Sequence, residues 1–222
     1  MGVDEVLRTW DEFPVRRTPR PIVLMDLAIG PGQPHVLGTR PVVSDVDLPA
    51  GLLERLQPPL SNNSEPARVS AVRRVWPEFR TDRGHRPLPA YRLQMDVPGG
   101  GPASWLMLDE WTESRVWWPE GLSTRCRGGL PGISASTVTD GGRTVRLLFQ
   151  GPLASYAAVR VRAVHESATA VLVEVEEVPH RSGSPMPLAA VGRVVVARLQ
   201  EPLGGRVLVG ADGLPVEVLD VE

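Results

Sequence analysis

The fold of this chain is constrained most by a series of short segments in its C-terminal part, in which apolar and polar side chains alternate. Such alternation is typical of a strand with one buried face, and closely spaced strands of this kind favour a sandwich or barrel over βαβ units. The turn Asp140-Gly141-Gly142 joins segments 133–138 and 143–150 and predicts a hairpin. Segments 156–164 and 170–178 alternate in the same way, and further strands are predicted at 191–199, 206–209 and 214–219.

Two of these segments permit a prediction of register. Segments 156–164 and 170–178 carry valines at odd positions, so a hairpin between them must place those valines together on the buried face. Arg160 then lies on the other face, opposite either Glu176 or Glu174. A slip of one residue is excluded on this argument, because it would pair a buried valine with a glutamate.

The C-terminal end is expected to organise the rest of the structure. Segment 191–199 is strongly apolar and is predicted to be a central, buried strand. Segments 206–209 and 214–219 flank the turn residues Ala211-Asp212-Gly213, so they are predicted to form a second hairpin.

The first half of the chain predicts short helices followed by further strands. Apolar residues at helical spacing indicate one helix within 3–13 and another within 48–56. Pro-rich and polar residues at 57–66 indicate a linker, and 68–79 with 88–97 are expected to form a hairpin. Two further strands are expected at 22–29 and 36–43.

These patterns predict a mainly β protein, an antiparallel sandwich or partly closed barrel with two short N-terminal helices. An N-terminal β-rich part with short helices, 1–127, is expected to pack against a C-terminal antiparallel part, 128–222.

The composition excludes several kinds of chemistry. All 24 basic residues are arginine, so neither a Walker-type phosphate loop nor a Schiff base is available. Cys126 is the single cysteine, which excludes an internal disulfide and a cysteine-rich zinc site. The net charge of −2 argues against nucleic acid as a partner. With no signal peptide and no long apolar run, we expect a soluble cytoplasmic protein with no membrane contact.

Two near-matches to catalytic motifs fail. His165-Glu166 begins like the zinc motif HExxH, but residue 169 is a threonine. Residues 132–136 lack the final glycine of the G-x-S-x-G nucleophile elbow and lie in a β-rich region, whereas that elbow joins a strand to a helix. We therefore predict no catalytic residue, no metal and no cofactor, although a site that histidines form only in the folded chain stays open.

An arginine-rich stretch is the first candidate site. Residues 68–92 contain seven arginines and only two acids, next to Trp76 and Tyr91. Arg73, Arg83 and His85 are the candidates for binding an anionic partner or a phosphate. The alternative, which we favour at this point, is that these arginines pair with acids elsewhere, because residues 199–222 contain five acids and one arginine.

A tryptophan-rich stretch is the second candidate site. Tryptophans cluster between residues 105 and 118 with acidic residues among them, and could line a ligand pocket or an interface, where tryptophan is enriched. Equally, they could close one end of the core. If Trp117 and Trp118 lie on a strand, at least one of them must face away from the core, because neighbouring residues of a strand point to opposite faces. The candidates are Trp105, Trp111, Trp117 and Trp118.

Parts of the chain resemble a group of uncharacterised actinobacterial β-rich proteins. The resemblance lies in residues 201–209 (EPLGGRVLV) and 212–216 (DGLPV), with 81–84 (TDRG) and 88–91 (LPAY) upstream, and covers about residues 70–222. The shared C-terminal pattern is PLGxRxLV…DGxPV, and no activity is known for that group, so no functional residue is carried over.

We therefore expect a non-enzymatic interaction or binding module that uses one of these two stretches to hold a protein or small-molecule partner. Self-association stays an open alternative. The other functional interpretation is a small enzyme or accessory protein of a biosynthetic pathway, with a tryptophan-lined pocket and one or more histidines.

Overall fold

The computed structural model describes residues 2–25, 40–57, 63–119, 133–180 and 190–219, and it is mainly β, as predicted. The chain forms two compact units, each made of segments that are far apart in the sequence. The predicted boundary between two parts at residue 127 is therefore not the boundary between these units. Unit 1 comprises 1–25, 80–85 and 117–222, and unit 2 comprises 26–79 and 86–116.

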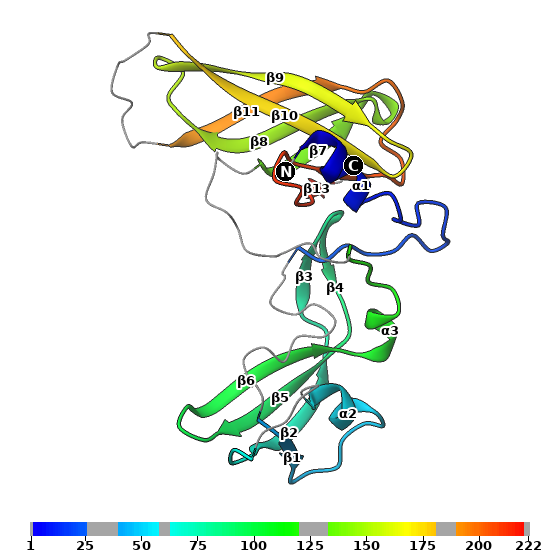
Figure 1. Ribbon diagram of the computed structural model, residues 1–222, viewed down its shortest axis with the longest axis vertical. Helices are drawn as coiled ribbons and strands as arrows, with labels where there is room; N and C mark the ends of the chain where they lie inside the picture. Colours follow the sequence, from blue (N-terminus) through cyan, green and yellow to red (C-terminus); the bar gives the residue numbers. More distant parts are fainter. Residues whose placement is uncertain (1, 26–39, 58–62, 120–132, 181–189, 220–222) are drawn as a thin grey trace. The chain divides into compact units, whose positions relative to one another are not determined.

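Unit 1 is a sandwich of two sheets (Figure 1). Apolar side chains from both sheets, such as Leu147, Phe149, Val173 and Val195, pack into one core between them. The first sheet has the order β11 (Val191–Arg198), β8 (Thr144–Gly151), β7 (Ile133–Thr139) and β13 (Val218–Leu219). The second has the order β12 (Val207–Val209), β10 (Ala170–Pro179) and β9 (Ala157–Glu166).

The predicted hairpin at Asp140-Gly141-Gly142 is confirmed, because β7 and β8 pair in antiparallel fashion around it. The turn is a short 3₁₀ segment, Asp140–Gly142, and all three of its residues have positive φ. Glycine adopts that conformation without steric cost, which explains the two glycines.

The prediction for the C-terminal end is wrong for its first strand and confirmed only in part for its hairpin. β11 is the first strand of its sheet, pairs only with β8 among the described strands, and alternates buried with exposed residues. Next to the predicted turn the two segments of the hairpin do meet: the N–H of Gly210 donates to the carbonyl oxygen of Leu214 at 3.0 Å, and the N–H of Val216 donates to that of Leu208 at 2.8 Å. The segments then separate, because β12 runs parallel to β10 while β13 runs parallel to β7 in the other sheet. The chain crosses between the sheets near Pro215, which bridges to Val209. Parallel pairs also make both sheets mixed rather than purely antiparallel.

A second core lies on the outer face of the β12–β10–β9 sheet. The predicted N-terminal helix is confirmed as α1 (Val3–Thr9). Trp10 and Phe13, which follow it, pack against Leu172 and Val207. β12 and the first residues of β10 are therefore buried on both faces.

The β9–β10 register is confirmed in one half and wrong in the other. Arg160 lies opposite Glu176 and forms an ion pair with it, which is one of the two predicted registers. A bulge beyond Val175 then shifts the register by one residue, so that Val173 lies opposite Val164. The slip is tolerated there because Leu172, on the other face of β10, is buried by the second core.

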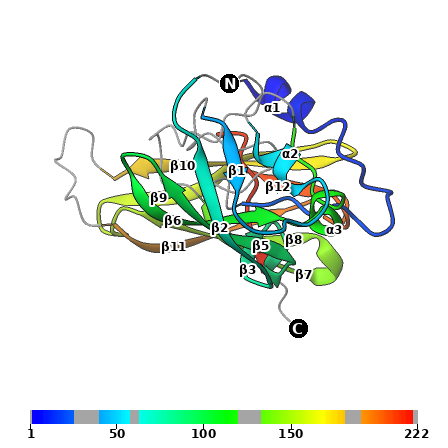
Figure 2. The same ribbon diagram turned by 90° about the horizontal axis from the view of Figure 1, so that it is seen from below.

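Unit 2 is a four-stranded sheet with helical cover (Figures 1 and 2). The second predicted helix is confirmed as α2 (Leu52–Leu56), whose Leu52 and Leu56 pack with Val69, Leu93 and Met95 in the core of this unit. A third helix, α3 (Glu110–Glu113), was not predicted. The strand order is β1 (Val42–Ser44), β2 (Ala67–Val75), β5 (Ala90–Val97) and β6 (Gly101–Leu108).

The predicted hairpin of segments 68–79 and 88–97 is confirmed in the antiparallel pairing of β2 with β5. The chain between them forms a further two-stranded ribbon, β3 (Glu78–Thr81) and β4 (Gly84–Pro87). The residues at the tip of this ribbon, 80–85, belong to unit 1. None of the described helices is both long enough and apolar enough to span a membrane.

Candidate functional site

The tip of the β3–β4 ribbon carries a buried carboxylate, Asp82. Arg20 holds it with two hydrogen bonds, from Nη2 to Oδ2 at 2.6 Å and from Nη1 to Oδ1 at 3.3 Å. The backbone N–H of Val23 donates to Oδ1 at 3.3 Å. The tight turn at the tip depends on Gly84, whose φ of 79° lies in the region that glycine favours. Asp82 is thus fully paired and serves to fix residues 20–23 to the ribbon.

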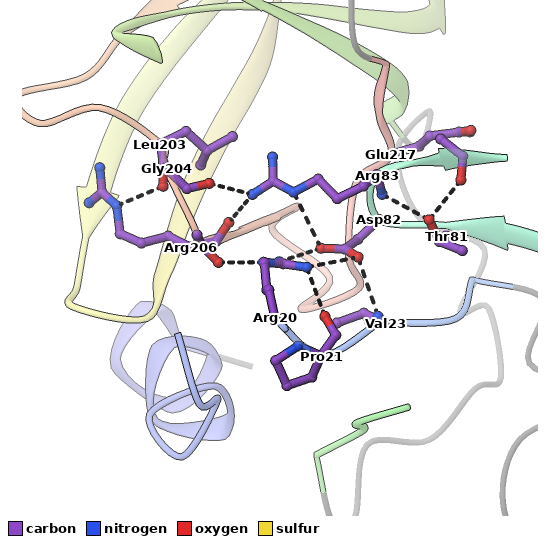
Figure 3. Close-up of polar contacts among 12 residues, drawn as sticks. Arg20, Pro21, Val23, Thr81, Asp82, Arg83, Leu203, Gly204, Arg206 and Glu217 are labelled. Atoms are coloured by element: carbon purple, nitrogen blue, oxygen red, sulfur yellow. Dashed lines mark hydrogen bonds and ion pairs between the residues drawn. The ribbon is translucent and has the colours of Figure 1, made fainter. Parts of the chain in front are cut away.

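Arg83 is also used within unit 1. Its Nη2 donates to the carbonyl oxygens of Gly204 at 2.8 Å and Arg206 at 2.7 Å (Figure 3). Arg206 in turn donates from Nη1 to Glu166 at 2.9 Å. Because Arg83 donates hydrogen bonds to these carbonyl oxygens and its side chain is only 15% exposed, it is not available to bind an anion.

This cluster changes the ionisation of Glu166. Burial raises the pKa of the Glu166 carboxyl, but hydrogen bonds from the N–H of Gln200, the Arg206 guanidinium and the N–H of Glu201 outweigh burial, so the pKa lies below its ordinary value. Residues 81–84 and 201–206 meet here, because Arg83 donates to the carbonyl oxygens of Gly204 and Arg206. Their role in this structure is to hold segments of unit 1 together.

A second buried carboxylate, Glu217, is only partly satisfied. Its Oε2 accepts from Arg80 Nε at 2.6 Å, while Oε1 has no hydrogen-bond partner among the described residues. His85 Nε2 lies 3.5 Å from Oε1, and this histidine is 58% exposed. His85 is therefore placed beside a carboxylate rather than in an arginine-rich surface. Within the described chain, no group of three histidine, cysteine, aspartate or glutamate side chains could hold a metal ion.

The four tryptophan candidates are divided between the two units. Trp117 and Trp118, both half-buried, pack against Trp10 with ring centroids 5.6 and 6.1 Å away and close the second core of unit 1. In unit 2, Trp105 is half-buried beside the core, and Trp111 is 46% exposed.

The tryptophans do not form one lined pocket within either unit. Arg115 stacks on the ring of Trp111, with its Cζ 4.0 Å from the centroid. Trp76, which follows β2, is 58% exposed and has Arg74 stacked at 5.3 Å. These are single exposed aromatic side chains, each covered on one side by a guanidinium group.

The seven arginines of residues 68–92 fall into two groups. Arg73, Arg86 and Arg92 are exposed and form no hydrogen bond or ion pair with the described residues. The other four have partners: Arg68 with Asp45, Arg74 with Asp109, Arg80 with Glu217, and Arg83 with the two carbonyls. The favoured interpretation, pairing with acids elsewhere, holds for Arg68, Arg74 and Arg80, although only Glu217 comes from residues 199–222.

Two of the unpaired arginines face each other. Arg73 on β2 lies directly opposite Arg92 on β5, and Leu106 on β6 completes the row. These side chains are on the face of the sheet that α2 does not cover, since the neighbouring Leu93 points into the core. Like charges directly opposite each other destabilise a sheet, so this pair is not explained by folding.

Sequence reasoning counted Arg92 but did not single it out. Arg92 could have been identified only from its position opposite Arg73. A bulge between Val69 and Ala71 shifts the pairing of β2 with β5 by one residue and so decides that position. A bulge of this kind leaves no pattern in the sequence that fixes which residues face each other.

Comparison of the chain with models of known families, with curated proteins and with solved structures gives no match. The arrangement of side chains is therefore the basis for any assignment of function.

Proposed function

We propose that this chain is a non-enzymatic binding module, and that the uncovered face of the β2–β5–β6 sheet binds an acidic segment of a partner protein through Arg73 and Arg92. The observation that carries the proposal is the pair of exposed, unpartnered arginines placed directly opposite each other. A bound carboxylate between them would turn their repulsion into attraction.

The chemistry of the pair suits carboxylates. Each guanidinium is planar, stays charged and offers donors in a fork that matches a carboxylate. The next row of the same face holds Gln94 and Ser104, directly opposite each other, which add an amide and a hydroxyl group. Asp96 and the net charge of −2 disfavour a long nucleic-acid track, whose binding needs many phosphate contacts.

The geometry supports the binding module over the small enzyme with a tryptophan-lined pocket. That alternative needs Trp111, Trp117 and Trp118 around one cavity, and neither unit by itself contains all three: Trp117 and Trp118 pack on Trp10 in unit 1, and Trp111 is in unit 2. The feature that would still favour an enzyme is His85 beside Glu217.

The test is a binding measurement with a fluorescein-labelled decaglutamate peptide as the probe. We expect salt-sensitive binding, because exposed charges are screened. The double variant Arg73→Gln/Arg92→Gln should weaken it roughly tenfold, the equivalent of about 1.4 kcal/mol. The matched control, Arg160→Gln/Arg162→Gln, removes two positive charges from β9 in unit 1 and should leave the affinity nearly unchanged.

Two results would overturn the proposal. One is equal weakening by the two double variants, which would indicate a general charge effect. The other is tighter binding to a DNA duplex than to the peptide at the same ionic strength, which would indicate a nucleic-acid surface.

A further inference from the structure

The β11–β8–β7–β13 sheet of unit 1 contains no acidic residue in any of its four strands. Its charged residues are three arginines, of which Arg193 donates to the carbonyl of Pro152 at 2.6 Å. Arg146 and Arg198 are exposed and form no hydrogen bond or ion pair with the described residues. The sheet is therefore uniformly basic, whereas β9 and β10 of the opposite sheet contain all of the acidic residues found in the strands of the sandwich.

The outer face of this sheet also exposes aliphatic side chains. Val194 and Val196 are each 52% exposed, and Leu148 is 41% exposed. Val194 lies directly opposite Leu148, and Val196 lies opposite Arg146. Figure 1 shows β8 and β11 side by side. On the far strand, Leu219 is 40% exposed and pairs with Thr137, which itself lies opposite Arg146.

Folding explains only part of this pattern. The inward residues of the same strands, including Val145, Leu147 and Val195, already fill the core of unit 1. A valine is favoured in a strand wherever it points, so Val194 and Val196 alone would be unremarkable as strand formers. Valine has this preference because it is branched at Cβ, whereas leucine is not. Leu148 adds an exposed aliphatic side chain directly opposite Val194. Adjacent exposed aliphatics on a sheet face are typical of an interaction site.

The two outer faces of the sandwich differ in how far they are covered by other residues of the chain. Trp10 and Phe13 cover the outer face of the β12–β10–β9 sheet. On the outer face of the β11–β8–β7–β13 sheet, Val194 and Val196 are left half exposed, and neither belongs to any of the described apolar clusters.

We propose that this second face docks an amphipathic segment of a partner protein, with aliphatic side chains on Leu148, Val194 and Val196 and carboxylates on Arg146 and Arg198. Charge selects this occupant. A second copy of the chain meeting it face to face would bring the same two arginines against each other, with no acid on either face to offset them. This surface lies in unit 1 and is separate from the Arg73–Arg92 pair of unit 2.

The experiment compares two synthetic 18-residue peptides as probes, an amphipathic leucine–glutamate sequence and the same sequence with lysine for glutamate. Binding to the full chain is measured by fluorescence anisotropy, and backbone amide shifts locate it. We expect the glutamate peptide to bind and to shift amides of β8 and β11. Val194→Thr/Val196→Thr and Arg146→Gln/Arg198→Gln should each weaken binding at least about tenfold.

Arg160→Gln/Arg162→Gln is the control, and it should leave this affinity within about twofold, because those exposed arginines lie on β9, in the other sheet of unit 1. Threonine keeps the branching of valine, and a thermal melt checks that each variant is folded. The proposal is overturned by equal binding of both peptides, by no binding at millimolar peptide, or by a concentration-dependent dimer that Val194→Thr/Val196→Thr abolishes, which would identify a second copy as the occupant.

Discussion

Arginines at the tip of the β3–β4 ribbon and on the β2–β5 sheet face come from the same stretch of sequence but have opposite roles. Arg83 is 15% exposed and donates to two carbonyls, beside an Asp82 that Arg20 already holds. Arg73 and Arg92 are exposed, unpaired with any described residue, and face each other. At the tip, burial forces each charge to have a partner, because an unpaired buried charge costs several kcal/mol. On the sheet face water solvates the charge, so pairing is optional.

The comparison teaches that an excess of arginine in the sequence does not identify a binding surface. An arginine is available to a partner protein only where it is both exposed and without a described partner, since Arg68 and Arg74 are exposed but paired. Stability measurements should therefore distinguish the two regions, with large effects at the tip and small ones on the face.

The largest effect is expected for Asp82→Asn. It leaves Arg20 without its carboxylate, and removing one member of a largely buried pair costs about 3 to 5 kcal/mol. Urea unfolding followed by circular dichroism measures this. The control, Glu176→Gln, removes the partner of Arg160, which is 68% exposed, and should cost no more than about 1 kcal/mol. Equal costs would show that the Arg20–Asp82 pair stabilises the fold no more than an exposed pair does.

The next largest loss of stability is expected for a tryptophan in the second core of unit 1, compared with a surface tryptophan of unit 2. Trp117→Ala should cost about 3 kcal/mol, because its ring packs against Trp10 and Phe13, the latter with a centroid separation of 5.2 Å. Trp111→Ala should cost under about 1 kcal/mol, since Trp111 is a surface residue stacked on Arg115. The measurement is the same urea titration. A larger loss for Trp111→Ala would mean that α3 supports the core of unit 2.

A smaller, pH-dependent effect is expected from Glu166 in unit 1 and Asp109 in unit 2. Burial raises the pKa of the Asp109 carboxyl, but hydrogen bonds from Thr112 and Arg74 outweigh burial and lower it below the ordinary value. A carboxyl with a lowered folded-state pKa stabilises the fold above its unfolded-state pKa, and that contribution is lost as pH falls through the folded-state pKa.

Both contributions should therefore be complete at neutral pH. The loss should begin below about pH 4.5 for Glu166 and about pH 3.8 for Asp109, the ordinary values of these carboxyls. Unfolding free energies of wild type and Glu166→Gln measured against pH should converge in acid. Parallel curves down to pH 2 would contradict the assignment.

The smallest effect is expected for Arg73→Gln. Because it removes a like-charge repulsion with Arg92, stability should stay the same or rise by up to about 0.5 kcal/mol. Arg68→Gln is the control on the same strand, since it breaks an exposed pair with Asp45 and should lower stability by about 0.2 to 1 kcal/mol. A marked loss of stability in Arg73→Gln would place Arg73 among the structural arginines.

The sequence by itself determined the elements whose signals are local. Alternation gave the strands, glycine-rich turns gave the β7–β8 hairpin, and helical spacing gave α1 and α2, because each depends on residues close together in the chain. Alternation also placed Arg160 on the same face as Glu174 and Glu176, and the structure selected Glu176 from these two predicted partners.

Tertiary structure alone decided the remaining features. β12 and β13 joined different sheets, and the β9–β10 register slipped beside Leu172, because α1 buries the second face of β10 and removes the penalty for a slip. The bulge in β2 set Arg73 opposite Arg92. At the tip of the ribbon, Arg83 donates hydrogen bonds to backbone carbonyl oxygens of unit 1. These outcomes depend on which segments meet and how much water they exclude, and pairing across such sequence distances leaves no local pattern.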